Sequence, residues 1–234
     1  MEDFGQGFAL LLKTLVGMNK PQTVKASQKG SVKGVSTRIP SPTPQNQYPY
    51  GASKADIEQV IREGAGAYTD LPVATLSGTM TNEMDKYPIF KKYPFLPVGQ
   101  SILESSGLKA FQTKPDLVNK PKQALGWGVY VDNYNPPTVQ DVFKDYISAI
   151  GGRRMDQETQ NYPEDVAKAR VNTSNTYKGF RDTGDINALA NIYAPKSDNP
   201  EHGGDVYANN LKNVMGTYDQ KLKKLMMTKY GPKK

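Results

Sequence analysis

The stretch "FLPVGQSILESSGLKAF", Phe95–Phe111, decides the fold, because it joins an apolar core helix to an abrupt end. Its apolar residues recur at helical spacing, which predicts a helix over 95–106. Pro97 falls in the first turn of this helix, where proline is tolerated. The helix then ends without bulk at Ser105, Ser106 and Gly107.

Glu104 stands out in this helix, because the pattern expects a core residue at its position. A carboxylate near the end of a buried helix is partly desolvated, which raises its pKa and keeps it protonated near neutral pH. A general acid for glycosidic cleavage needs this state. The alternative is a helix-end carboxylate that reaches solvent, since most glutamates are exposed.

The composition excludes several other chemistries. The chain has 234 residues, of which 37% are hydrophobic, and this supports one core of about 150–180 residues. It has no cysteine and one histidine, His202, which excludes disulfides, thiolate chemistry and multi-histidine metal sites. The acidic residues of 196–205 do not match the spacing of an EF-hand, so we expect no metal and no cofactor. The net charge of +7 favours a polyanionic partner.

Four segments are expected along the chain. Residues 1–18 are apolar after an acidic start, which departs from a secretory signal and favours an amphipathic helix. Such a helix packs on its own domain or docks on a virion partner or a membrane surface. Residues 19–49 are basic and rich in Pro, Ser and Gln, as in a linker. Residues 50–220 form the folded domain, and a basic tail covers 221–234.

Helical periodicity dominates the folded domain. Ser53, Thr138 and Asp182 or Asp185 are expected N-caps. A loop is expected after the helix that starts near Tyr162. The expected helical segments are 53–63, 75–94 with a break near Pro88, 95–106, 138–152, 162–180 in its first part, 185–195 and 204–226.

The period is lost over 112–137, which predicts a small irregular β lobe. This segment contains "ALGWGVYV", with Trp127 between two glycines, Gly126 and Gly128. The glycines permit close backbone approach, and the indole offers a stacking face for a pyranose ring. A packed core tryptophan is the alternative.

Taken in order, these motifs resemble a family. The motifs are "YTDLPVA", "PVGQSILESSG", "GWGVY", "TVQDVFKDYISAIGG", "IYAP" and "YANNLKNVM", spread over roughly 50–218. The set resembles the glucosaminidase-like peptidoglycan hydrolases of the lysozyme superfamily. The resemblance implies a mainly α (α+β) lysozyme-like domain with a small β lobe that cleaves the glycan strand of the bacterial cell wall.

The resemblance also implies roles for single residues. Glu104 matches the catalytic acid of the "ES" motif, and Tyr193 matches the tyrosine of "YAP", which lies near the reacting sugar in relatives. The remaining expected substrate-binding residues are Ser105, Ser106, Gly126, Trp127, Gly128 and Tyr130.

A second catalytic carboxylate is less well defined. Asp116 and Asp132 are the candidates near the expected β lobe, and Asp132 is preferred because it follows the "GWGVYV" segment. An inverting hydrolase needs a base about 6.5–9.5 Å from the acid to hold a water. Without such a base, help from the acetamido or 6-hydroxyl group of the substrate is expected.

Three alternatives remain open at this stage. A lytic transglycosylase is disfavoured because no Gly-Leu-Met-Gln segment follows the "ES" helix. A structural or wall-binding protein of a virion or envelope complex would use the same fold without catalysis. Specific nucleic-acid binding is disfavoured because the basic residues are scattered. The expected partner is peptidoglycan, and the expected place of action is the cell wall, reached by a phage or virion-associated enzyme without an evident signal peptide.

Overall fold

Helices surround one central helix, α5 (Leu96–Ser105). This computed structural model describes residues 47–113, 120–125, 136–197 and 200–231. They all belong to one unit of the chain, Gln45–Lys234. None of these described residues lies in a β-strand, so the fold is mainly α, as predicted.

The other helical elements follow in order along the chain. They are η1 (Pro49–Gly51), α2 (Lys54–Glu63), η2 (Gly66–Tyr68), η3 (Pro72–Leu76), α3 (Ser77–Met84), α4 (Pro88–Lys92), α6 (Lys109–Thr113), η5 (Pro121–Ala124), α7 (Val139–Gly151), α8 (Met155–Glu158), α9 (Glu164–Thr176), α10 (Lys178–Thr183), α11 (Ile186–Tyr193) and α12 (Asp205–Tyr230). Among the described residues, no helix is both long enough and apolar enough to span a membrane.

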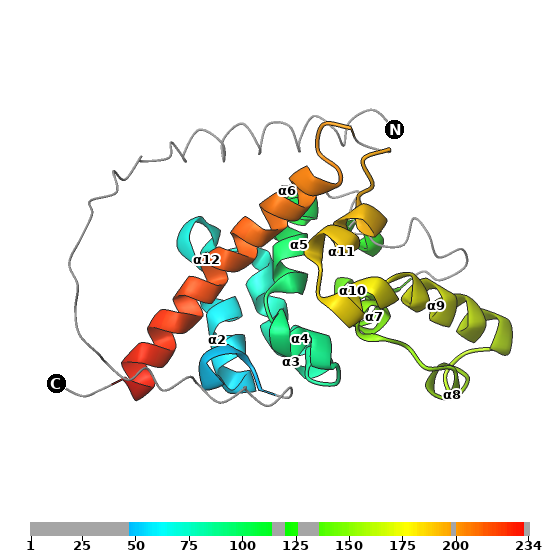
Figure 1. Ribbon diagram of the computed structural model, residues 1–234, viewed down its shortest axis with the longest axis horizontal. Coiled ribbons are helices and arrows are strands. Elements are labelled where there is room, and N and C mark those ends of the chain that lie inside the picture. Colours follow the sequence, from blue (N-terminus) through cyan, green and yellow to red (C-terminus); the bar gives the residue numbers. More distant parts are fainter. Residues whose placement is uncertain (1–46, 114–119, 126–135, 198–199, 232–234) are drawn as a thin grey trace, which may run out of the picture. The chain divides into compact units, whose positions relative to one another are not determined.

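Other elements enclose α5 on nearly every side. Nine of its ten residues are buried, and Glu104 is the exception. The long helix α12 packs along α5 and also contacts α2 and α11 (Figure 1). Elements α6, α7 and η5 contact α5 as well. Gly99 permits the close approach of α12, because a Cβ there would lie 3.0 Å from Leu211 Cδ1.

The predicted helix starts are confirmed where a polar side chain caps the helix. Ser53 forms a capping box with Asp56 at the start of α2. Thr138 accepts a hydrogen bond from the backbone N–H of Asp141 at the start of α7. Of the two predicted caps for α11, the structure uses Asp185, which accepts from the backbone N–H of Asn187 at 2.9 Å.

Two helical stretches extend beyond their predictions. A loop was expected after α9, but the chain forms α10 there, because Phe180 brings an apolar side chain into the core. The folded domain was expected to end at residue 220, but α12 continues to Tyr230. Leu222 and Met226 are buried on this last part of α12, so the packing surface continues past the predicted boundary.

The segment predicted as a β lobe is described only in part. Residues 120–125 contain the short helix η5, and the run "GVYVDNY" lies outside the described residues. The predicted N-terminal helix, 1–18, and the linker up to residue 46 also lie outside them.

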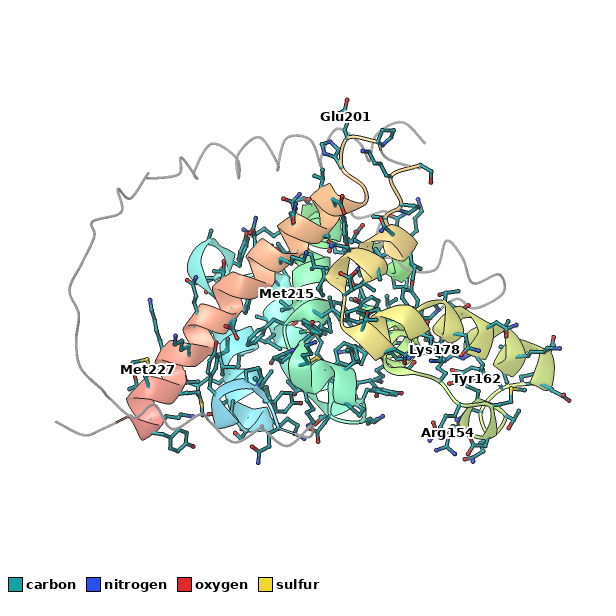
Figure 2. All side chains as sticks on the ribbon, in the orientation of Figure 1. Arg154, Tyr162, Lys178, Glu201, Met215 and Met227 are labelled. Atoms are coloured by element: carbon teal, nitrogen blue, oxygen red, sulfur yellow. The ribbon has the colours of Figure 1, made fainter. Side chains whose placement is uncertain are left out.

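A buried ion cluster ties α7, α8 and α9 together. Asp145 Oδ1 of α7 accepts from Arg153 Nη2 at 2.5 Å and from Arg170 Nη1 at 2.6 Å. Arg170 of α9 also donates to Glu158 of α8 and lies over the ring of Tyr162, which Figure 2 shows beside these helices. The side chains of Arg153 and Asp145 are 0% and 1% exposed. Two acidic and two basic groups therefore balance one another away from water.

Replacement of Asp145 tests this cluster. Asp145→Asn leaves two buried guanidinium groups with one carboxylate, so we expect a loss of about 3–5 kcal/mol in the free energy of unfolding. Urea unfolding followed by circular dichroism measures it. The matched control is Asp156→Asn, which breaks the exposed pair with Arg154 and is expected to change stability by less than about 1 kcal/mol. Equal effects of the two changes would contradict the structural role of the cluster.

Candidate functional site

Glu104 is held at the C-terminal end of α5 by a sharp helix termination. Ser106 adopts the left-handed conformation, with φ 53° and ψ 41°, and Gly107 follows with φ 64°. The backbone N–H of Gly107 returns to the carbonyl of Ser101, which closes the helix end. A Cβ on Gly107 would lie 2.7 Å from Leu71 Cδ1, so glycine is required by both conformation and space. The "SSG" sequence therefore ends α5 one residue after Glu104.

Ser105 lies inside this junction. Its side chain is buried, and its Oγ lies 2.8 Å from the carbonyl oxygen of Ala124 in η5. The same Oγ accepts a hydrogen bond from the backbone N–H of Leu108 at 3.2 Å. Ser105 was predicted to bind substrate; the structure places it between α5 and η5. Ser106, predicted for the same role, is partly exposed at the helix end.

We expect Ser105→Ala to lower stability by about 1–3 kcal/mol, because a buried carbonyl and a buried N–H each lose a partner. Thermal unfolding measures this change. Ser106→Gly is the matched control, since Ser106 has a left-handed backbone that glycine adopts without strain, and we expect it to leave stability unchanged or slightly raised. If Ser105→Ala leaves the stability unchanged, the structural role of Ser105 between α5 and η5 is contradicted.

The carboxyl group of Glu104 receives a hydrogen bond from a distant helix. Tyr207, in the first turns of α12, donates from its hydroxyl to Glu104 Oε1 at 2.7 Å. Gln100 of α5 donates from Nε2 to the Tyr207 hydroxyl oxygen at 3.3 Å. Gln100 and Tyr207 are both buried. A chain of three polar groups therefore runs from the interior to Glu104.

Tyrosines from two more helices lie beside the hydrogen-bonded groups Gln100, Tyr207 and Glu104. The ring of Tyr193, at the end of α11, stacks on Tyr207 with centroids 5.9 Å apart. The ring of Tyr146 on α7 meets Tyr193 edge-on at 6.1 Å. The hydroxyl oxygens of Tyr146 and Tyr193 are buried. Burial, followed by the nearby charge of Glu104, raises the pKa of Tyr193 well above its ordinary value. The structure thus brings Glu104 and Tyr193, two predicted site residues, to the same tyrosine.

Burial dominates the electrostatics of Glu104. Desolvation raises the pKa of its carboxyl group from 4.5 to about 7, against a smaller lowering by the Tyr207 hydrogen bond. Within the described ranges, Glu104 has no ion-pair partner. The side chain nevertheless keeps some exposed surface. Near neutral pH it is therefore an acid with comparable amounts of its protonated and ionised forms.

A surface pocket of about 360 Å³ lies near the end of α5 but does not include Glu104. Its lining is mostly apolar: Pro72, Thr75, Leu76, Leu108, Phe111, Gln112, Val139 and Gln140. Leu108 connects this pocket to the turn that ends α5. No group of three or more acidic or histidine side chains suited to a metal ion occurs among the described residues.

The remaining predicted site residues come from the segment expected to form a β lobe. Gly126, Trp127, Gly128, Tyr130 and Asp132 all lie outside the described residues. Sequence reasoning missed Gln100 and Tyr207. Gln100 stands four residues before Glu104, which places it on the same face of a helix, and this spacing was an available signal. Tyr207 is 103 residues from Glu104 and had no local signal.

Comparison of the chain with protein-family models, curated proteins and solved structures finds no match in any of the three.

The raised pKa of Glu104 predicts a dependence of stability on pH. Between 4.5 and about 7 the folded state binds the proton more tightly than the unfolded state, so the free energy of unfolding falls as pH rises through this range. We expect a loss of at most about 3 kcal/mol, because solvent screens the partly exposed side chain. Glu104→Gln removes this contribution. Urea unfolding of wild type and Glu104→Gln between pH 4.5 and about pH 7 measures this contribution. If the free energy of unfolding depends on pH in the same way in both proteins, the raised pKa of Glu104 is contradicted.

Proposed function

We propose that this protein is a peptidoglycan hydrolase that cleaves the glycan strand with Glu104 as general acid. The observation that carries the proposal is a carboxyl group with a pKa of about 7, next to a tyrosine hydroxyl and without an ion-pair partner in the described part of the chain. Such a group gives up a proton readily near neutral pH. The ordered motifs that resemble glucosaminidase-like hydrolases support the same chemistry.

In the proposed reaction, Glu104 donates its proton to the glycosidic oxygen as the bond to the anomeric carbon breaks. A water molecule then supplies a hydroxyl group to that carbon and releases one proton, which restores the acid. Tyr193 would lie beside the reacting sugar, since it stacks on the tyrosine that contacts Glu104. Asp132 is the proposed second carboxylate, and the acetamido group of the substrate is the alternative.

The finer fold belongs to the same proposal. A lysozyme-like arrangement places a small β lobe, here within 112–137, across a groove from the helical body. Trp127 would then offer its indole face to a sugar ring. The net charge of +7 favours binding to the anionic polymers of a cell wall. Residues 1–18 would attach the enzyme to a virion or membrane-surface partner.

Digestion of purified peptidoglycan tests the proposal. Wild-type protein is expected to release reducing ends, and Glu104→Gln is expected to lower the rate at least about 100-fold, because it removes the general acid and keeps the side-chain shape. The matched control is Glu164→Gln on the exposed first turn of α9, which should retain full activity.

Mass spectrometry of the products separates the competing functions. Hydrolysis gives reducing sugars, whereas a lytic transglycosylase gives 1,6-anhydro ends. Sedimentation of the protein with walls without any cleavage would favour a structural or wall-binding role. Equal cleavage by wild type and Glu104→Gln would remove Glu104 from the mechanism.

A further inference from the structure

The hydrogen bonds that link Gln100, Tyr207 and Glu104 can run in either direction. The Tyr207 hydroxyl has a single proton, which it donates to Glu104, and its oxygen accepts from Gln100 Nε2. The other end of the Gln100 amide, Oε1, is buried and has no hydrogen-bond partner within the residues that the structure describes. No hydrogen bond at Oε1 among the described residues therefore opposes a half turn of the amide.

The two ends of an amide differ in their hydrogen bonding. Nε2 donates and Oε1 accepts, and a half turn about the last side-chain bond exchanges them. In the arrangement seen, Gln100 donates to Tyr207 and Tyr207 donates to Glu104, which suits an ionised carboxylate because it only accepts. After the half turn, Oε1 would accept from Tyr207, and the Tyr207 oxygen would accept from a protonated Glu104.

We propose that Gln100 and Tyr207 form a reversible hydrogen-bond relay that supports Glu104 in both of its protonation states. The inference rests on the proposed function for its purpose, because a general acid must lose and regain its proton in every turnover. The Tyr207 proton stays on Tyr207 throughout, and only the direction of the hydrogen bonds changes. Gln100 and Tyr207 are positioning residues, since both act through Glu104.

The surroundings suit this relay. Within the described part of the chain, the ionisable groups influenced by the charge of Glu104 are tyrosines: Tyr207 on α12, Tyr193 on α11 and Tyr146 on α7. Burial raises the pKa of each far enough that none ionises near neutral pH. Of these four described side chains, Glu104 is therefore the one whose protonation changes near neutral pH, and the relay responds to that change.

Nuclear magnetic resonance tests the relay without any substrate. In wild-type protein, the side-chain amide signal of Gln100 is expected to shift with the same midpoint as the Glu104 carboxyl carbon between about pH 5 and about pH 9. In Glu104→Gln the amide signal should stay constant. An amide signal that does not move while Glu104 titrates would overturn the relay, whether or not the protein cleaves peptidoglycan.

Two variants distinguish the role of Tyr207 from that of Gln100. Tyr207→Phe removes the donor to the carboxylate, so we expect the pKa of Glu104 to rise by about one unit and cleavage to slow about tenfold with KM unchanged. Gln100→Leu removes support from both protonation states, so the pKa should change by less than half as much while kcat still falls. If Gln100→Leu raises the pKa of Glu104 as much as Tyr207→Phe does, Gln100 acts only as a donor to Tyr207, and the proposal is overturned.

The matched control is Tyr218→Phe. Tyr218 is buried on the same helix, α12, and its hydroxyl reaches the carbonyl of Tyr68. It is expected to leave the pKa of Glu104 unchanged. If Tyr218→Phe shifts this pKa as much as Tyr207→Phe, the effect comes from general loosening of α12 and the relay is overturned. If the wild-type protein does not cleave peptidoglycan, the proposed function is contradicted, but the titration experiment still tests the relay.

Discussion

The structure depends on the burial of α5 with a single acidic side chain at its end. Neighbouring helices cover nearly the whole surface of α5, so Glu104 can be satisfied only from within the protein or through its remaining exposed surface. Tyr207 supplies the internal hydrogen bond from α12, the helix that also packs against α5 at Gly99. The packing of α12 on α5 therefore also gives Glu104 its hydrogen-bond partner.

Asp145, which is buried, and Glu104, which is partly buried, show how the surroundings of a carboxylate decide its role. Asp145 accepts hydrogen bonds from two arginines, so its charge is compensated and it joins helices together. Glu104 has a neutral hydroxyl as its partner instead, and burial raises its pKa to about 7. This raised pKa lets Glu104 exchange a proton near neutral pH, which makes it the candidate for acid catalysis.

Local sequence signals were sufficient for most of the helical framework. Capping residues such as Ser53 and Thr138 fix helix starts through short-range hydrogen bonds, and these were predictable because their partners lie three residues away. The end of α5 was also predictable from "ESSG", since a left-handed turn at Ser106 and Gly107 depends on local backbone preferences. The predicted end of the folded domain at residue 220 leaves out Leu222, because the burial of Leu222 depends on a surface formed by distant residues.

By itself the sequence determined a mainly helical protein with an acid at the end of its core helix, since periodicity and helix ends are encoded within a few neighbouring residues. Only the tertiary structure decided which groups meet that acid. Tyr207 of α12 donates a hydrogen bond to Glu104, and Tyr193 of α11 stacks on Tyr207. Ser105 lies between α5 and η5 and donates to the carbonyl oxygen of Ala124. The physical reason is that desolvation and hydrogen-bond partners are properties of the packed interior, where residues a hundred positions apart become neighbours.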